Sequence, residues 1–269
     1  MIFLSFTSEY FTINGIKSID IGVNGCYLVR VGNSEINRQI IGGKSLNEEQ
    51  IPYNDLPYLY RISKQPIEFD LQFSILDKEY SSDTLMELGK IFGGDKYIPF
   101  TSCDYPQVQF FVICTSIELI TFGLHKGYFS CKLRTSAPYA FALTEISTFD
   151  FSDISSPTTF TLVNKSNVSD SLGNYYYIPE KILIDLKDTS TEILISNNSD
   201  NGREFKFTSL SLLESLTIDN KMGRITSSTG LSRLSNFNKN FLRLIYGTNN
   251  LVCFNKCILQ FQSMFPVYI

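Results

Sequence analysis

The sequence predicts an all-β protein of two domains with a single flanking helix. The chain of 269 residues contains 22 Phe and 15 Tyr, which favour strands, but only three Ala, the residue that most favours helices. Short segments that alternate apolar and polar residues recur along its length, as half-buried strands do. With 43% hydrophobic and 19% charged residues, the chain has the composition of a globular protein.

The first predicted element is a β-hairpin within residues 11–23, FTINGIKSIDIGV. Asn14 and Gly15 lie between two short apolar runs, and both tolerate the positive φ that a type I′ turn requires. We therefore expect two short antiparallel strands joined by this turn.

Three more strands are expected in the N-terminal half. Residues 67–75, IEFDLQFSI, alternate without interruption, which indicates a strand with one buried face and one face in water. Residues 108–114 and 128–134 combine aromatic, β-branched and alternating side chains and are also predicted to be strands.

The one predicted helix covers about residues 83–93, within SSDTLMELGKIFGG. Thr84 and Glu87 have the spacing of a capping box, and two glycines can end the helix. The apolar residues expected on its buried face are Leu85, Leu88 and Phe92.

A change of composition near residue 145 predicts a domain boundary, with an N-terminal domain over 1–145 and a C-terminal domain over 146–269. The stretch 147–161 is rich in Ser, Thr, Asp and Pro, as linkers are. Beyond it, short strands with frequent turn signals predict a sandwich or jelly roll. The expected strands are 181–186, 191–196, 203–208, 215–219, 223–226, 241–246 and 257–262.

A long, irregular segment is expected at residues 31–62, between the first hairpin and the 67–75 strand. Loops beyond about 12–15 residues are usually functional or mobile. This one carries apolar and aromatic residues that would be costly to leave in water. We interpret it as a contact with another subunit; an extra edge strand on its own domain is the alternative. The candidate interface residues are Ile40, Ile41, Tyr53, Leu56, Tyr58 and Tyr60.

Motifs for chemistry are largely missing from the sequence. The single histidine, His125, lies between two glycines and is expected in a solvated turn. No nucleophile motif, phosphate-binding loop or zinc-ligand spacing accompanies it, so no catalytic or metal residue and no cofactor is predicted. Residues 197–204, NNSDNGRE, are rich in oxygen ligands but lack the spacing of a calcium loop, and a hairpin turn explains them better.

Two carbohydrate-related alternatives stay open. A glycosidase needs two carboxylates about 5–9 Å apart, which the sequence does not exclude among 27 acidic residues. A sugar-binding module would stack sugar rings on aromatic faces. Trp is absent, but residues 175–177, three consecutive tyrosines, could serve, although the start of a strand is the simpler interpretation.

The net charge of −4 and the lack of a basic cluster argue against a nucleic-acid partner. The N-terminal MIFLSF is too short for a secretory signal, and no apolar run could span a membrane, so we expect a cytoplasmic origin. The six cysteines are then expected to be thiols. Cys253 and Cys257 lie four residues apart in an apparent strand, about 13 Å, which is too far for a disulfide.

In order along the chain, several stretches resemble the distal tail protein (Dit) family of long-tailed phages. They are FTINGIKSIDIGV, YLYRISKQPIEFDLQFSI, the helix with GGDKYIPFTS, GLHKGYFSCKLRTSAPYAF, GREFKFTSLSLLESLTIDNKMGRI and FNKNFLRL followed by GTNNL. One departure is IIGGK at 40–44, where many members carry a Pro-Gly-Arg-like turn. The departure affects the expected shape of the long segment.

The resemblance implies a homohexameric ring at the distal end of the virion tail, assembled in the host cytoplasm. The N-terminal domain would be a β-sandwich whose ring continues the tail tube, and the C-terminal domain a galectin- or carbohydrate-module-like jelly roll. Implied partners are the major tail tube protein and the tail-associated fibre or lysin protein, with tape-measure and receptor-binding proteins as further candidates. No catalysis, cofactor, nucleic acid or membrane is implied. The alternative function is a glycan-binding adsorption module that contacts the host cell wall.

Overall fold

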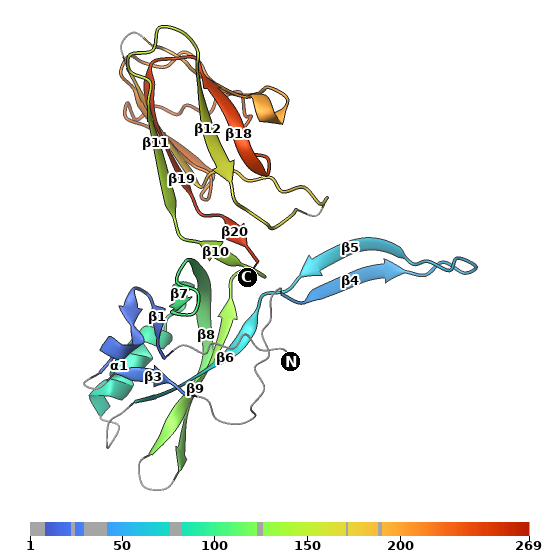
Figure 1. The fold of residues 1–269 in the computed structure, drawn as a ribbon, viewed down its shortest axis with the longest axis vertical. Helices are drawn as coiled ribbons and strands as arrows, with labels where there is room; N and C mark the ends of the chain where they lie inside the picture. The colour runs from blue at the N-terminus through green and yellow to red at the C-terminus, as the bar shows by residue number, and fades with distance from the viewer. Residues whose placement is uncertain are drawn as a thin grey trace. The chain divides into compact units, whose positions relative to one another are not determined.

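The computed structural model describes residues 9–22, 25–29, 42–75, 82–122, 126–170, 172–187 and 190–268. The chain divides into two compact units, which are described separately: residues 1–142 with 268–269 form the first, and 143–267 the second. The fold is mostly β, with one α-helix in the described part of the chain, as the sequence predicts (Figure 1).

The first unit contains ten strands, one α-helix and one 3-10 helix in its described part. They are β1 (Phe11–Ile13), β2 (Ile16–Lys17), η1 (Ser18–Asp20), β3 (Cys26–Leu28), β4 (Lys44–Glu49), β5 (Tyr58–Lys64), β6 (Glu68–Ile75), α1 (Ser82–Phe92), β7 (Ile98–Ser102), β8 (Val108–Phe122), β9 (Lys126–Thr135) and β10 (Ala140–Ala142).

The main sheet of the first unit runs in the order β2-β1-β7-β8-β9-β6-β3 and curls back on itself. Three strands separate β1 from β6, yet the rings of Phe11 and Phe73 lie 5.7 Å apart between their centroids. The Leu28 N–H, on the last strand, donates a hydrogen bond of 2.9 Å to the carbonyl of Glu9, just before β1. The two ends of the sheet therefore approach each other around an aromatic core.

The first hairpin forms as predicted. Asn14 and Gly15 have φ of 49° and 79°, the left-handed conformation that a type I′ turn requires. Ile13 pairs with Ile16 across this turn, and Phe11 is fully buried against Phe100 of β7.

Helix α1 forms where predicted, but its capping box does not. Thr84 lies inside the helix and is buried. The carboxylate of Glu87 instead accepts a hydrogen bond of 3.1 Å from the Gly22 N–H, which joins the helix to the segment after η1. Leu88 and Phe92 are buried as expected, whereas Leu85 is exposed, because the buried face also includes Thr84.

The second unit packs two antiparallel sheets face to face. One has the order β11-β19-β13-β16-β17 and the other β12-β18-β14-β15. Phe160 of β12 and Phe261 of β19 stack 6.0 Å apart between the sheets. The elements are β11 (Glu145–Asp150), β12 (Thr158–Asn164), β13 (Lys181–Leu186), β14 (Ile193–Asn197), η2 (Asn198–Asp200), β15 (Arg203–Phe207), β16 (Ser215–Asp219), β17 (Arg224–Ser227), β18 (Gly247–Cys253), β19 (Cys257–Ser263) and β20 (Pro266–Val267).

Two sequence-based expectations for the second unit are wrong. Residues 147–161, taken as linker-like, contain most of β11 and the start of β12. Residues 241–246 form only an isolated bridge, between Leu244 and Tyr177, and the strand lies further on, at β18. The alternating pattern of 241–246 correctly indicates which side chains are buried, since Leu242 and Leu244 both face the core.

Residues 241–246 are held by hydrogen bonds from buried asparagine side chains rather than by a full ladder of hydrogen bonds to a neighbouring strand. Asn197 Nδ2 donates to the Arg243 carbonyl at 2.8 Å and to Asn249 Oδ1 at 3.0 Å. Asn249 also accepts from the Ile245 N–H at 2.9 Å. These amides satisfy backbone groups that would otherwise be buried without partners.

The distance expected between Cys253 and Cys257 is also wrong. Cys253 ends β18 and Cys257 begins β19, so a turn rather than a continuous strand separates them. Because the two strands belong to opposite sheets, both side chains face the interior, with their sulfur atoms 3.6 Å apart.

Candidate assembly interface

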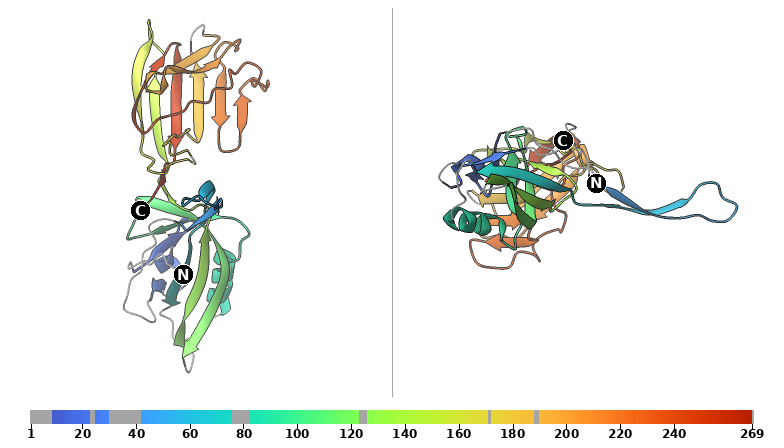
Figure 2. Two further views of the ribbon diagram at one scale, coloured as in Figure 1. Left: turned by 90° about the vertical axis from the view of Figure 1, so that its right-hand side faces the viewer. Right: turned by 90° about the horizontal axis from the view of Figure 1, so that it is seen from below.

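Residues 44–64 form a β-hairpin, here called the arm, within the segment expected to be irregular. Strands β4 and β5 make a two-stranded sheet of their own, with a turn at residues 50–57. Figure 2 shows the arm as a long ribbon with no other strand beside it. The structure thus corrects the expected lack of regular structure, and the arm is not an edge strand of the main sheet either.

A β-bulge sorts the arm's apolar side chains onto one face. Leu46 pairs with Ile62, and Glu48 pairs with Leu59, with an irregular register between Asn47 and Glu48. Leu46 and Glu48 share a face because they are two residues apart on one strand. Leu59 and Ile62, three residues apart, therefore also share a face, which an unbulged strand would not allow.

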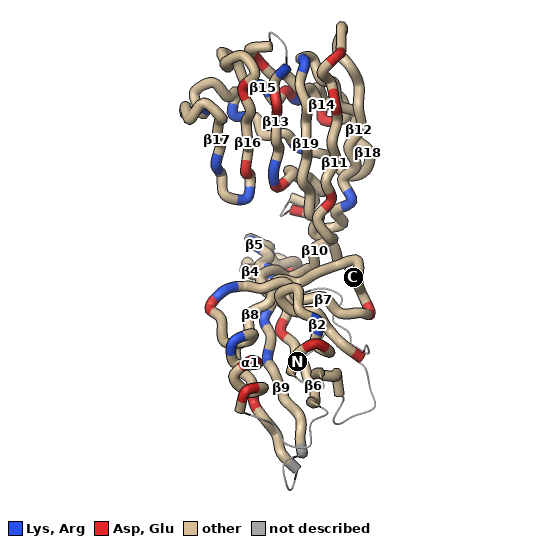
Figure 3. The backbone as a smooth tube through the Cα atoms, turned by 90° about the vertical axis from the view of Figure 1, so that its left-hand side faces the viewer, with Lys and Arg blue, Asp and Glu red and all other residues tan. Residues whose placement is uncertain are grey.

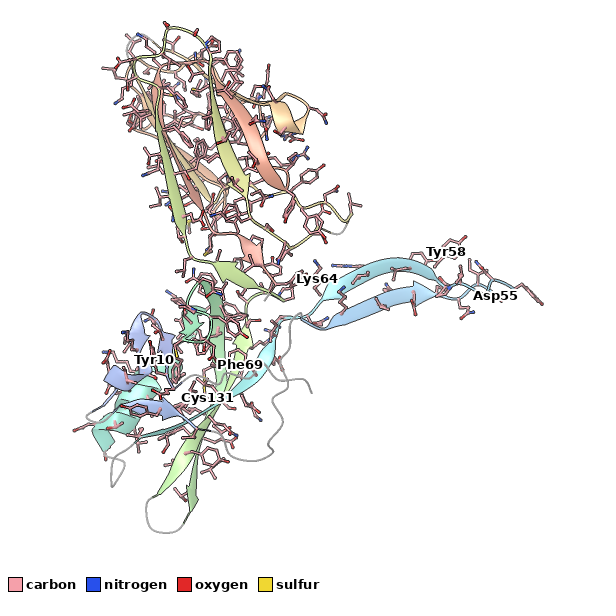
Figure 4. The ribbon with its side chains drawn as sticks, in the orientation of Figure 1. Tyr10, Asp55, Tyr58, Lys64, Phe69 and Cys131 are labelled. Atoms are coloured by element: carbon pink, nitrogen blue, oxygen red, sulfur yellow. The ribbon has the colours of Figure 1, made fainter. Side chains whose placement is uncertain are left out.

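The described candidate interface residues all lie on the arm and are exposed. Tyr53 and Leu56 are in the turn, where Tyr53 is fully exposed and Leu56 is 73% exposed. Tyr58 and Tyr60 lie on β5, and Figure 4 shows Tyr58 on the arm with Asp55 in the turn beyond it. Ile40 and Ile41 lie outside the described residues.

Three exposed apolar side chains on the strands of the arm were not among the residues predicted from the sequence. Leu46, Leu59 and Ile62 are 56%, 52% and 44% exposed. The alternation in YLYRISK was a signal for a strand, but the segment was expected to be irregular, and on the arm only the tyrosines and Leu56 were named. The bulge, which places them on one face, leaves no mark in the sequence.

Close backbone contacts and aromatic side chains anchor the base of the arm. The Gly42 N–H donates to the Pro138 carbonyl at 3.1 Å, and the Gln65 N–H donates to the Gly43 carbonyl at 2.7 Å. Lys64 Nζ, at the end of β5, lies 5.9 Å from the ring centroid of Tyr268. The Tyr268 ring lies edge-on to that of Tyr139, with 6.2 Å between centroids, and burial raises the pKa of Tyr139. The base is thus fixed, while the strands beyond it are in solvent.

Charges of both signs lie along the arm. Lys44 pairs directly with Lys64, and Asn47 with Arg61. The Tyr60 hydroxyl donates a hydrogen bond of 3.0 Å to the Glu49 carboxylate. The second unit likewise intersperses both signs along its strands, with no face of one sign in the view of Figure 3.

A separate pocket of about 330 Å³ in the second unit is lined by Asn167, Tyr175 and Tyr246. The two tyrosine rings lie 5.8 Å apart between centroids and are tilted by 57°. Asn164 Nδ2 donates to the Tyr175 carbonyl at 2.8 Å, and Asn249 Nδ2 donates to the Gly247 carbonyl, next to Tyr246, at 3.0 Å. Buried amides therefore hold the backbone at or next to both tyrosines.

The three consecutive tyrosines have three different surroundings. Only Tyr175 contributes to the pocket. Tyr176 lies under the Arg243 guanidinium, 4.0 Å from its ring centroid. Tyr177 is buried, where its hydroxyl oxygen accepts a hydrogen bond of 2.7 Å from the Met264 N–H, and burial raises its pKa to about 12. The sequence had offered all three together as one platform.

The oxygen-rich stretch at 197–204 forms a turn between two strands. Arg243 donates hydrogen bonds to both carboxylate oxygens of Asp200, at 2.7 and 2.9 Å. Asn201 and Gly202 take positive φ, as the turn interpretation expects. Among the residues that the structure describes, no three His, Cys, Asp or Glu side chains gather as metal ligands would.

His125 lies outside the described residues, so the prediction that it occupies a solvated turn stays a prediction. Of the helices in the described part of the chain, none has the length and apolar character to cross a membrane.

Comparison with known proteins identifies the family of the chain. A family model described as the phage tail protein N-terminal domain matches residues 6–137, and one described as the phage tail C-terminal domain matches residues 141–263. The chain belongs to this family of phage tail proteins. The resemblance to a phage tail family seen in the sequence is therefore confirmed. No curated protein matches the chain in sequence.

The fold of this phage tail protein is similar to that of the Dit protein of phage SPP1, described as a paradigm of the hub adsorption apparatus in phages that infect Gram-positive hosts. The match has a TM-score of 0.65 at 10% identity and covers 95% of this chain and 98% of that one. Two structures of the phage P2 baseplate in its activated conformation, with Ca and with Sr, match at 13% identity with TM-scores of 0.47 and 0.44. They cover 84% and 83% of this chain and 88% and 89% of theirs.

Proposed function

We propose that this phage tail protein is the hub of a tail tip, in which six copies close a ring through the arm. The first unit would continue the tube formed by the major tail tube protein and meet the tail-associated fibre or lysin protein. The second unit would dock adsorption proteins. Tape-measure and receptor-binding proteins are further candidate partners. On this proposal the protein presents surfaces at the distal end of the virion tail and catalyses no reaction.

The exposed apolar face of the arm carries the proposal. Large apolar side chains gathered on one exposed surface usually mark a protein contact. The arm has two such groups, Leu46, Leu59 and Ile62 on one face and Tyr53 and Leu56 in the turn. A closed ring requires a heterologous interface, in which one patch of each copy meets a different patch of the next. An arm that forms its own sheet suits that role.

The fold likeness to the SPP1 Dit protein supports the same assignment. That protein is described as part of a hub adsorption apparatus, and the likeness extends over both units of this chain. The count of six copies rests on the resemblance of the sequence to the distal tail protein family.

The test is the mass of the purified protein in solution, measured by light scattering, with negative-stain images of the same peak. We expect six-fold rings for the natural sequence and monomers for the double variant Tyr58→Asp, Tyr60→Asp, because ring closure would bury two carboxylates without partners. Tyr246→Asp is the matched control, since Tyr246 and Tyr60 are both 64% exposed. Rings that form normally in the double variant would exclude Tyr58 and Tyr60 from the interface.

A second candidate function, glycan binding at the host wall, is favoured by the pocket of Tyr175 and Tyr246. Two aromatic faces and an amide at a preformed hollow suit a sugar ring, which stacks its C–H face and hydrogen-bonds its hydroxyl groups. We expect the full-length protein to be retained on host cell walls and the variant Tyr175→Ala, Tyr246→Ala to be released. Equal retention of both proteins would remove the pocket from consideration, and no retention of either would remove the function.

A further inference from the structure

Two cysteines on neighbouring strands of the first unit bring their sulfur atoms within 3.2 Å. Cys114 lies on β8 and Cys131 on β9. Figure 4 shows Cys131 within the sheet of the first unit. The register shifts between Cys114 and Ser116, so that Cys114 pairs with Leu133 while Cys131 pairs with Ile117. Cys131 and Leu133 share a strand face, and therefore both sulfur atoms lie on the same side of the sheet.

The two thiols differ in access and in acidity. Cys131 is fully buried, whereas Cys114 is only half-buried. The hydrogen bond between them lowers the pKa of Cys114 and raises that of Cys131, and burial raises the pKa of Cys131 further. Cys114 is thus the sulfur that ionises first and the one that a reagent in solvent can reach. Thiolate character and access are what make a cysteine reactive.

We propose that Cys114 and Cys131 form a redox site that closes to a disulfide when the tail protein passes from a reducing cell interior into an oxidising medium. The oxidant is a small-molecule disulfide. The Cys114 thiolate attacks one of its sulfur atoms, forms a mixed disulfide and expels one thiolate. Cys131 then attacks the Cys114 sulfur, which expels the second thiolate, and the proton of Cys131 passes to that leaving thiolate. Two protein thiols are oxidised and one small disulfide is reduced to two thiols.

The inference rests on the family of the chain and not on ring assembly. Tail proteins are made inside a host cell, where thiols stay reduced, and virions leave that cell. The bridge would join β8 and β9, the two longest strands of the first unit, beside a bulge where their ladder is interrupted.

The second unit provides an internal control. Cys253 and Cys257 have their sulfur atoms 3.6 Å apart, but both side chains are fully buried. Proximity is thus nearly the same in the two pairs, while access to a bulky reagent differs. The proposal therefore predicts that an oxidant too large to enter the core distinguishes them.

The experiment treats the full-length, reduced protein with oxidised glutathione under native conditions. The reaction is quenched with acid, the protein is unfolded, the remaining thiols are alkylated, and digested peptides are identified by mass spectrometry. We expect peptides joined through Cys114 and Cys131, lighter by two hydrogens, with Cys253 and Cys257 alkylated. Glutathione that stays on Cys114 while Cys131 is alkylated would overturn the proposal, as would alkylation of all four thiols.

Two variants test the order of the steps. Cys131→Ser removes the resolving thiol, so we expect a stable mixed disulfide of glutathione on Cys114. Cys114→Ser leaves the buried thiol, so we expect Cys131 to stay unmodified. Modification of Cys131 as fast as that of Cys114 would overturn the assigned order. Circular dichroism checks that each variant folds. The peptides of the wild-type protein show by themselves whether the disulfide forms, so that result does not depend on either variant.

Discussion

At the scale of single residues, the second unit contains a buried ion pair between Arg233 and Glu214. Arg233 Nη2 and Nε bind the two carboxylate oxygens of Glu214 at 2.6 and 2.7 Å, and the side chains are only 8% and 0% exposed. Glu214 also accepts a hydrogen bond of 2.7 Å from the Ser211 N–H. Burial alone would raise the pKa of Glu214, but the hydrogen bonds from Arg233, Ser227 and Ser211 outweigh it and leave the pKa lowered.

This ion pair predicts loss of stability in acid. Because the folded-state pKa of Glu214 is depressed, its contribution is complete above the unfolded-state value of about 4.3 and is lost as the pH falls through the folded-state value. We expect Glu214→Gln to cost about 3–5 kcal/mol of unfolding free energy at pH 7, since Arg233 stays buried without its counter-charge. The variant should also lose less stability than the natural protein between pH 7 and pH 3, measured by urea unfolding.

An exposed ion pair of the same length supplies the control. Lys165 Nζ and Glu145 Oε1 also lie 2.6 Å apart, but their side chains are 53% and 45% exposed. Glu145→Gln should therefore cost less than about 1 kcal/mol. Equal costs for the two Glu→Gln changes would contradict the importance of burial.

At the scale of elements, the arm depends on a tight packing point at its base. A Cβ added at Gly42 would lie 2.3 Å from the Gln65 carbonyl oxygen and 2.6 Å from Pro138 Cβ, whereas a Cβ at Gly43 would meet nothing closer than 3.9 Å. Two neighbouring glycines of the same segment thus differ sharply in the space around them.

We therefore expect Gly42→Ala, but not Gly43→Ala, to displace the base of the arm. The first change should cost about 1–3 kcal/mol of stability, because the added methyl overpacks the site. It should also weaken ring formation without altering any side chain of the arm. Thermal melting and light scattering of both variants give the comparison. Natural ring formation in Gly42→Ala would show that the position of the arm does not matter for assembly.

Strands stabilised by their own ladder were predictable from an alternating pattern, whereas features that depend on register or on distant contacts were not. Residues 67–75 alternate throughout, and β6 forms there. On the arm, YLYRISK alternates as a strand does, but nothing in the sequence marks the bulge between Asn47 and Glu48 that decides which side chains share a face. Residues 241–246 have the alternation of a strand but give their backbone groups to Asn197 and Asn249, contacts that no local pattern reveals.

At the scale of the whole molecule, composition was enough for the fold class but not for contacts across the chain. Abundant Phe and scarce Ala predicted β structure, and the single helix was located from its spacing. The proximity of Cys253 and Cys257 depends on β18 and β19 lying in opposite sheets, which is a property of topology. Four exposed residues of the arm, Tyr53, Leu56, Tyr58 and Tyr60, could be named from the sequence, because a long apolar segment is conspicuous. The pocket of Tyr175 and Tyr246 could not, because its two rings lie 71 positions apart in the sequence.

Strands β4 and β5 form a sheet with no third strand, which has a thermodynamic consequence for the proposed ring. A two-stranded hairpin alone in water is marginally stable, and here two like charges, Lys44 and Lys64, face each other at its base. Part of the free energy released when a neighbour accepts the arm must then offset its loss of conformational entropy. Each contact would be weaker than its apolar area suggests, so a subunit placed wrongly could dissociate before the circle is complete. The completed ring would dissociate slowly, because each subunit then makes interfaces with two neighbours and both must break before it can leave.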